Sequence, residues 1–280
     1  MQKLLVALIT LLPATPTFGQ SPDGDNNQPG RLFDWHQGIG VQSPLQEDMR
    51  VYLWFYEWNM FEARTKGQHT RGAYNWKRTV SDDGATATID AGDMKLTARA
   101  VHDGAELTLK ITNATDHAWP EIAGIIPCFN PGTPAGVRRL RNRRPEAPRN
   151  EEFVNTNTWY VGHSGFEKLV ARQIHFNDRL RAQVDGEAQD GQYVFSQKWP
   201  TSPDNATQGL IVRESTSGGW VAGIAWEEFL SSQGHNPWSC MHLSVNVGPL
   251  KPGESKTIRG RMYLFPGTRD ECLKRFRTEF

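Results

Sequence analysis

Alternation of apolar and polar residues with a period of two is the feature that most constrains this chain. Three runs show it most clearly. At 107–112 and 241–247 apolar residues alternate with polar ones, and at 220–226 Trp220, Ala222, Ile224 and Trp226 alternate with Val221, Gly223 and Ala225. Successive side chains of a β-strand point to opposite faces, so this pattern is typical of strands with one buried face. The chain is therefore expected to consist mainly of half-buried strands.

Turn sequences separate these runs. They combine Gly with Asp or Pro, and they occur at Asp82-Asp83-Gly84, Asp103-Gly104, Asp185-Gly186, Asp190-Gly191 and Lys251-Pro252-Gly253-Glu254. Such residues favour tight turns, because Gly adopts positive φ without strain and the Asp side chain bonds to the nearby backbone. Short strands joined by tight turns predict an all-β fold, an antiparallel β-sandwich.

One helix is expected, close to the C-terminus. Thr268 and Glu271 have the spacing of a capping box, in which each side chain accepts a hydrogen bond from the other residue's backbone N–H. Beyond the cap, one helical face is formed by four residues: Cys272, Leu273, Phe276 and Phe280. The sequence thus predicts a short C-terminal helix that packs against the sandwich. The apolar residues within 54–62 fit a short helix or, almost as well, a strand.

The N-terminus has the order of parts typical of a secretory signal. Lys3 precedes an apolar run over 4–12, and a polar, helix-breaking stretch with small residues follows. Nothing later approaches the about 18 consecutive apolar residues of a membrane-spanning helix, so no span is expected in the mature chain. We expect a secreted or periplasmic protein with a signal peptide over 1–19, a flexible leader over 20–31 and a single β-sandwich domain over 32–280.

Formal charge is balanced, with 31 Lys and Arg against 31 Asp and Glu, and the isoelectric point is about 7.1. A neutral chain has no general attraction to nucleic acid, so no nucleic-acid partner is expected. The three cysteines, Cys128, Cys240 and Cys272, allow one disulfide at most. HExxH and paired CxxC motifs are absent, and the spacing of His235 and His242 matches no zinc signature. Neither a metal nor a cofactor is therefore expected.

Two segments resemble a known superfamily. The run LTLKITNATDHAWPEIAGIIPCFNPG, at 107–132, places a strand ending in Asn113 and a Trp-Pro pair before a second apolar strand. The run VGPLKPGESKTIRGRMYLF, at 247–265, places a Pro-Gly-Glu turn before a long strand. Both are similar to segments of the galactose-mutarotase-like supersandwich, a superfamily of sugar epimerases and of sandwich domains in polysaccharide lyases and glycosidases. As a whole the chain resembles secreted proteins of environmental bacteria. The resemblance implies a supersandwich form of the fold and assigns no catalytic residue.

The most unusual segment is 233–242, QGHNPWSCMH. Gly234 and the pair Asn236-Pro237 predict an irregular turn that places His235 and Trp238 in a loop. His242 follows on a strand, where it shares the polar face with Cys240, Ser244 and Asn246, and Glu227 lies upstream. An imidazole and a carboxylate within reach of each other perform acid–base chemistry near neutral pH, so we expect catalytic roles for His235, His242 and Glu227. The alternative is a structural turn whose histidine bonds to the backbone.

A second candidate is the arginine-rich run over 137–152, which contains Arg139 and Arg141. Arginine forms bidentate pairs with carboxylate and sulfate groups, so these two residues are expected to bind an acidic polysaccharide. The alternative is a solvated loop in which the arginines pair with the glutamates of the same run.

Tryptophan is abundant, with ten in the chain. Flat indole faces suit the apolar faces of sugar rings, and Trp159 and Trp238 are favoured as ligand contacts by their predicted loop context. Asn236 is expected to contact the same ligand. Tyr160 and His163, close to Trp159 in sequence, could join them, with Tyr160 as an acid or base and His163 as a substrate contact.

These features together predict a secreted carbohydrate-active protein, such as a lyase or an epimerase acting on an acidic glycan. Arginines would neutralise a uronate carboxylate, and His235 or His242 would remove the neighbouring proton. Two alternatives remain: a non-catalytic protein that binds glycans with the same residues, and a structural envelope protein without a small ligand.

Overall fold

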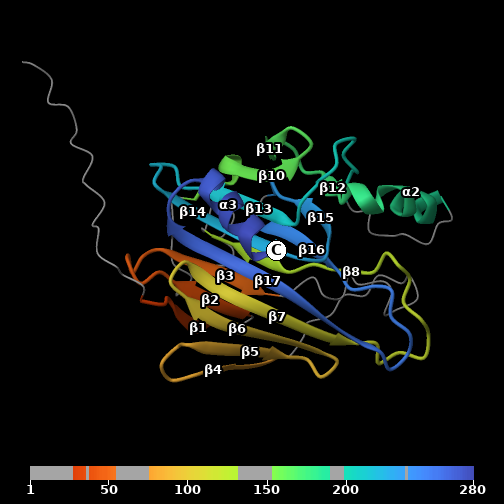
Figure 1. The fold of residues 1–280 in the computed structure, drawn as a ribbon, viewed down its shortest axis with the longest axis horizontal. Coiled ribbons are helices and arrows are strands. Elements are labelled where there is room, and N and C mark those ends of the chain that lie inside the picture. The colour runs from red at the N-terminus through yellow and green to blue at the C-terminus, as the bar shows by residue number, and fades with distance from the viewer. Residues whose placement is uncertain (1–27, 36–37, 55–75, 132–152, 190–198, 237–238) are drawn as a thin grey trace, which may run out of the picture.

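Two antiparallel β-sheets pack face to face in the computed structural model, which describes residues 28–35, 38–54, 76–131, 153–189, 199–236 and 239–280 (Figure 1). The first sheet has the strand order β1 (Arg31–Trp35), β2 (Gly38–Gln42), β3 (Arg50–Trp54), β9 (Cys128–Asn130), β16 (Met241–Asn246), β15 (Phe229–Gln233) and β12 (Ile174–Phe176), and β8 (Gly124–Ile125) also pairs with β16. This arrangement confirms the predicted all-β sandwich.

The second sheet is longer and contains the C-terminal strand. Its order is β11 (Gly165–Lys168), β10 (Thr158–Gly162), β13 (Leu210–Glu214), β14 (Trp220–Trp226), β17 (Ser255–Pro266), β7 (Gly104–Thr112), β6 (Met94–Val101), β5 (Thr86–Asp90) and β4 (Lys77–Val80). The three alternating runs of the sequence correspond to the strands β7, β14 and β16. β7 has the predicted single buried face, whereas the prediction of half-buried strands is wrong for β14 and β16. Both are buried on their two faces, β14 because α3 covers its outer side.

The main hydrophobic core lies between the sheets and follows from the alternation. Leu53, Phe129 and Leu243 point into it from the first sheet, and Leu109 and Ile224 point into it from the second. Gly104 begins β7 with φ of +139° at the turn from β6, and a Cβ there would lie 1.9 Å from the carbonyl oxygen of Met262. That close approach of β17 explains why glycine occupies the predicted Asp103-Gly104 turn.

Two α-helices in the described ranges flank the sandwich. The predicted C-terminal helix is α3 (Arg269–Glu279), and its capping box between Thr268 and Glu271 is complete. It packs on the second sheet over β13 and β14, with Cys272, Leu273 and Phe276 buried. The other helix, α2 (Arg181–Gln189), follows a 3-10 turn over Asp178–Leu180 and was not predicted. A further 3-10 turn spans Asn155–Asn157.

The Asp185-Gly186 turn prediction is wrong, because both residues lie inside α2. The Asp185 carboxylate accepts hydrogen bonds from Arg181 Nε at 2.9 and 3.0 Å, one helical turn away. This pair and the packing of Val184 against Phe176 and Trp199 outweigh the local preference of Asp-Gly for a turn.

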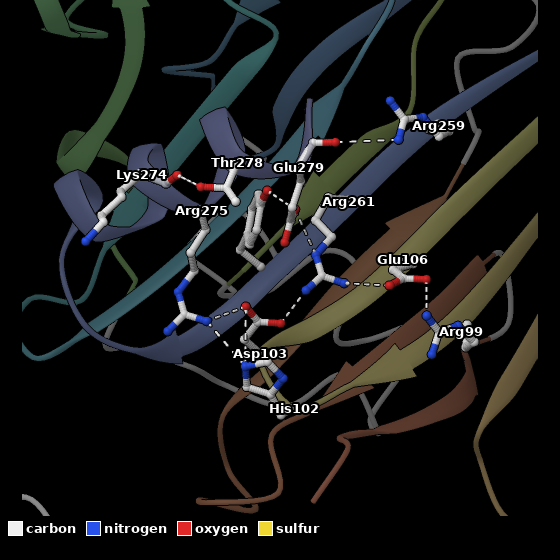
Figure 2. A network of polar contacts seen from close by, with 11 residues as sticks. Arg99, His102, Asp103, Glu106, Arg259, Arg261, Lys274, Arg275, Thr278 and Glu279 are labelled. Carbon is white, nitrogen blue, oxygen red and sulfur yellow. Dashed lines mark hydrogen bonds and ion pairs between the residues drawn. The ribbon is translucent and has the colours of Figure 1, made fainter. Parts of the chain in front are cut away.

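A network of charged side chains joins α3 to the second sheet (Figure 2). The buried Asp103 carboxylate accepts hydrogen bonds from Arg261 of β17 and, at 2.6 Å, from Arg275 of α3. Glu279 of α3 pairs with Arg261 at 3.3 Å and accepts a 2.6 Å hydrogen bond from the Tyr263 hydroxyl. The last helix is therefore held by ionic contacts as well as by its apolar face.

The expected signal peptide over 1–19 and most of the leader over 20–31 lie outside the described residues, as do residues 55–62 of the stretch that fitted a helix or a strand. The signal peptide, the leader and the single domain over 32–280 stay predictions. None of the helices in the described ranges has the length and apolarity required to cross a lipid bilayer.

Candidate functional site

The outer face of the first sheet, directed away from the main core, carries a row of aromatic and polar side chains. In register across four strands lie Trp54, Cys128, His242 and Gln233. Their sequence neighbours Leu53, Phe129 and Leu243 face the core, so the alternation itself turns this row outward. The row thus brings together residues from β3, β9, β16 and β15.

Cys128, Cys240 and His242, here called the cysteine–histidine cluster, lie at the centre of this row. The Cys128 Sγ atom is 3.3 Å from His242 Nε2, and the two sulfur atoms and the imidazole nitrogen all lie within 4.8 Å of one another. Cys240 immediately precedes β16 and lies two residues before His242, and Cys128 is the cross-strand neighbour of His242. All three side chains are buried, and no disulfide joins any of the three cysteines of the chain.

A buried arginine reaches the cluster from the other sheet. Arg213 of β13 is 0% exposed and donates to Thr158 Oγ1 at 2.8 Å and to Ser239 Oγ at 2.8 Å and the Ser239 carbonyl at 3.1 Å. It also donates to Asn155 Oδ1 at 3.2 Å. Burial lowers the pKa of Arg213 to about 9, and attraction to the neighbouring Cys240 opposes this shift. Within the described residues, every hydrogen-bond acceptor of Arg213 is neutral.

The loop that leads into Cys240 has unusual backbone geometry. Among the residues that the structure describes, His235 and Ser239 are the non-glycine residues with positive φ, at 55° and 57°. The Asn236 side chain brackets Cys240, donating to its carbonyl at 2.8 Å and accepting from its N–H at 3.3 Å. A left-handed backbone at a non-glycine residue costs about 1–3 kcal/mol and persists only where surrounding contacts hold it. The loop therefore fixes the position of Cys240.

Aromatic rings border the cluster on both sides. Trp35 contacts the ring of Trp54 at 4.9 Å and that of Tyr52 at 4.7 Å, and burial raises the pKa of Tyr52 well above its usual range. On the other side, Trp199 stacks on His242 with ring centroids 5.7 Å apart, and the Arg172 guanidinium lies 4.5 Å above the Trp199 ring. His242 thus has the Trp199 ring on one side and the sulfur atoms of Cys128 and Cys240 on the other.

Three of the residues predicted from the sequence come together here. His242 belongs to the cluster, and His235 and Asn236 lie in the loop that leads into it, at the end of β15 that pairs with His242. His235 is half-buried. Trp238, Arg139 and Arg141 lie outside the described residues.

The other predicted residues lie elsewhere. Glu227 is at the opposite end of β15 and accepts from the Arg259 backbone N–H at 2.6 Å and from its Nε at 2.9 Å. His163 is exposed in the turn between β10 and β11, with Nε2 3.4 Å from an Asp178 oxygen. Trp159 lies in strand β10 rather than in the predicted loop, with the Arg269 guanidinium 4.1 Å from its ring centre.

Tyr160 lies on the inner side of β10, between the sheets. Its hydroxyl donates to Glu167 at 2.6 Å, and its ring is 4.1 Å from the His175 ring. Burial, followed by the hydrogen bond to Glu167, raises the pKa of Tyr160 above its ordinary range. Burial also lowers the pKa of His175, whose Nδ1 is 3.1 Å from the carbonyl oxygen of Asp204.

Sequence reasoning missed Cys128 and Trp199 as neighbours of His242, and Arg213 as a neighbour of Cys240. Cys128 and His242 are 114 positions apart, and their contact follows from the pairing of β9 with β16. The alternation did place Cys240 and His242 on one face, which was the available signal. The absence of a metal stays a prediction, but the donors that could hold one are now adjacent.

Comparisons with known proteins add a resemblance of fold. The chain matches no protein-family model and no curated protein. One similar solved structure is a galactose mutarotase-like protein from Lactobacillus casei ATCC 334, at 10% identity and a TM-score of 0.36, over 84% of this chain and 99% of that one. Another is a galactose mutarotase related enzyme from Lactobacillus acidophilus, at 9% identity and a TM-score of 0.40, over 85% of this chain and 98% of that one. A polysaccharide lyase is 12% identical with a TM-score of 0.32, over 69% of this chain and only 23% of the lyase. These are distant structural likenesses, with TM-scores of at most 0.40, and neither a family nor an activity follows from them.

Proposed function

We propose that this chain is a secreted carbohydrate-active protein whose ligand binds on the outer face of the first sheet, beside His242. The observation that supports this proposal is the position of His242 between the Trp199 ring and a row of polar side chains. Indole faces pack against the apolar faces of sugar rings, while polar groups beside them bind hydroxyls.

In this proposal His242 is the general acid or base, and the half-buried His235 is the second candidate for that role. Both belong to the same end of the first sheet, so a single ligand could contact either of them. Glu227 and Tyr160 do not share this position, and their side chains already bond to Arg259 and Glu167. Proton transfer is therefore assigned to the histidines alone.

An acidic glycan is the substrate class that the proposal favours. The exposed Arg172 lies over the Trp199 ring, where its guanidinium could bind a uronate carboxylate while the sugar packs nearby. Neutralising that carboxylate makes removal of the adjacent proton easier, which is the step shared by lyases and epimerases that act on uronic acids.

A glycan screen on the protein purified after export tests the proposal. Binding and the appearance of unsaturated or reducing ends are recorded for neutral, uronic and sulfated polysaccharides. We expect turnover of a uronic polysaccharide that His242→Ala abolishes, whereas His102→Ala, at an exposed histidine beside α3, leaves it unchanged.

The second candidate function is glycan recognition without turnover, which the same aromatic row would support. Binding with no product, weakened by Trp199→Ala and unaffected by His242→Ala, would favour this reading. If the protein neither binds nor turns over any glycan, both proposals are contradicted.

A further inference from the structure

We propose that Cys128, Cys240 and His242 bind a thiophilic metal ion, and that this ion is Zn²⁺ held by three protein ligands. This site goes beyond the carbohydrate proposal and does not depend on it. With the ion bound, His242 Nε2 is a ligand, and the acid–base role falls to His235, the second candidate. Thiolate and imidazole are the donors that zinc prefers in proteins, and two cysteines with one histidine are sufficient for a catalytic type of zinc site.

The geometry of the cluster fits such an ion. Zinc binds sulfur at about 2.3 Å and imidazole nitrogen at about 2.0–2.1 Å, so tetrahedral ligands of the two kinds lie about 3.5 Å apart. The Cys128 Sγ to His242 Nε2 distance is 3.3 Å, and all three donor atoms lie within 4.8 Å of one another. Small side-chain movements would therefore place them around one metal.

The charges around the cluster also fit. Metal ligation requires the cysteines as thiolates, and before the ion binds, a buried anionic sulfur is costly without positive charge nearby. Arg213 supplies that charge from the second sheet, and its hydrogen bonds are to neutral acceptors rather than to a carboxylate. A buried guanidinium paired in this way stabilises an anionic group beside it, and the neighbouring group is Cys240.

The surroundings hold the donors in place. Cys128 and His242 are on paired strands, and the Asn236 side chain fixes the Cys240 backbone through two hydrogen bonds. The Trp199 ring stacks on the His242 imidazole and restricts its rotation. Such outer contacts tune zinc sites by orienting the ligands.

Three donors make up the group found among the described residues. A tetrahedral zinc with three protein ligands keeps a fourth position for water or a bound ligand, which distinguishes catalytic from structural zinc sites. This position would lie on the outer face of the first sheet, since all three ligands project from it.

Direct metal binding to the wild-type protein is the first test. The protein purified after export is reduced, stripped with a chelator and titrated with Zn²⁺ against a colorimetric competitor, and separately with Co²⁺. We expect one equivalent of Zn²⁺ and, with Co²⁺, the thiolate charge-transfer absorption and intense visible bands of a tetrahedral sulfur-containing site.

Ligand variants locate the ion. Cys128→Ser, Cys240→Ser and His242→Gln should each weaken Zn²⁺ binding by at least about 100-fold, beyond the 10–100-fold typical of an outer contact. Cys272→Ser is the matched control, since Cys272 is equally buried but lies on the sheet-facing side of α3. It should bind Zn²⁺ as the wild type does.

Thiol alkylation on the wild-type protein avoids any folding defect of the variants. Bound Zn²⁺ should slow modification of Cys128 and Cys240, mapped by mass spectrometry, and leave the rate at Cys272 unchanged. A disulfide between Cys128 and Cys240 in the exported protein would overturn the proposal. So would binding that the three ligand variants do not weaken, and stoichiometric binding of Cu⁺ without Zn²⁺ would overturn the assignment to zinc.

Discussion

Two buried arginines of the second sheet have opposite surroundings. Arg261 on the outer side is 5% exposed and contacts the carboxylates of Asp103 and Glu279 (Figure 2). Arg213 on the inner side is fully buried, and its described hydrogen-bond acceptors are hydroxyl, carbonyl and amide oxygens. One cation is neutralised within the fold, whereas the other leaves positive charge beside Cys240.

This difference indicates that Arg261 stabilises the fold, whereas Arg213 belongs to the proposed metal site. Removing an ion from water costs several kcal/mol, and a well-placed carboxylate offsets this cost. The Asp103 network meets that condition and connects α3 to the sheet. Arg213 has a pKa lowered to about 9 by burial, which shows that its neutral partners compensate only in part. A positive charge kept under these conditions favours an anionic group nearby, here the thiolates of the proposed metal site.

The largest effect is expected for Asp103→Asn. This change leaves Arg261 buried beside a neutral amide, and breaking one side of a buried ion pair costs about 3–5 kcal/mol of unfolding free energy. Denaturation in guanidinium chloride measures it. Glu106→Gln is the control. Glu106 is about half exposed, pairs with the exposed Arg99 and approaches Arg261 only at 3.9 Å, so its loss should cost less than about 1 kcal/mol. Equal losses for the two variants would contradict the structural role of Asp103.

Arg213→Met should separate stability from binding. It removes hydrogen bonds together with the cost of a buried charge, so the loss of unfolding free energy should stay within about 2 kcal/mol. Zinc affinity should fall by about 10–100-fold, as for other outer contacts of metal sites. Arg261→Met is the matched change. It should lose more unfolding free energy than Arg213→Met and should bind zinc with the wild-type affinity. The comparison fails if the two variants lose zinc affinity equally.

A third buried group capable of positive charge, His175, should make stability depend on pH. Burial lowers the folded-state pKa of His175 below its ordinary value of 6.5, against smaller opposing effects of Asp204 and Glu167. The unfolded chain therefore binds the proton first, so stability is complete above about pH 6.5 and falls with acidification until the folded pKa is passed. The slope contributed by this group is at most about 1.4 kcal/mol per pH unit.

Unfolding measured between pH 7.5 and about 5 checks this contribution. In His175→Phe the dependence of unfolding free energy on pH should lose the part that comes from protonation of His175. The phenyl ring can still pack against Tyr160. An unchanged slope would show that other groups cause the acid sensitivity.

The smallest effect is expected for Thr268→Ala, at the cap of α3. Loss of the hydrogen bond from the Glu271 N–H should cost about 1 kcal/mol, measured by the same denaturation. Zinc affinity should not change, because α3 covers the side of the second sheet opposite to Arg213. A change in zinc binding would mean that the two regions are coupled.

Local patterns predicted much of this architecture. The alternation in 107–112, 220–226 and 241–247 predicted β7, β14 and β16, and the Thr268 and Glu271 pair predicted the start of α3. These features depend on the alternation of side chains along a strand and on hydrogen bonds between residues three positions apart, both of which neighbouring residues determine. The same pattern placed Cys240 and His242 on one face.

The candidate site required the tertiary structure. Cys128 reaches His242 because β9 pairs with β16, and Arg213 reaches Ser239 because the two sheets pack together. Strand order is decided by the burial of apolar surface over the whole sandwich, and no local pattern encodes it. The sequence by itself therefore determined which residues face outward, and the packing of the two sheets decided that two cysteines, a histidine and a buried arginine meet.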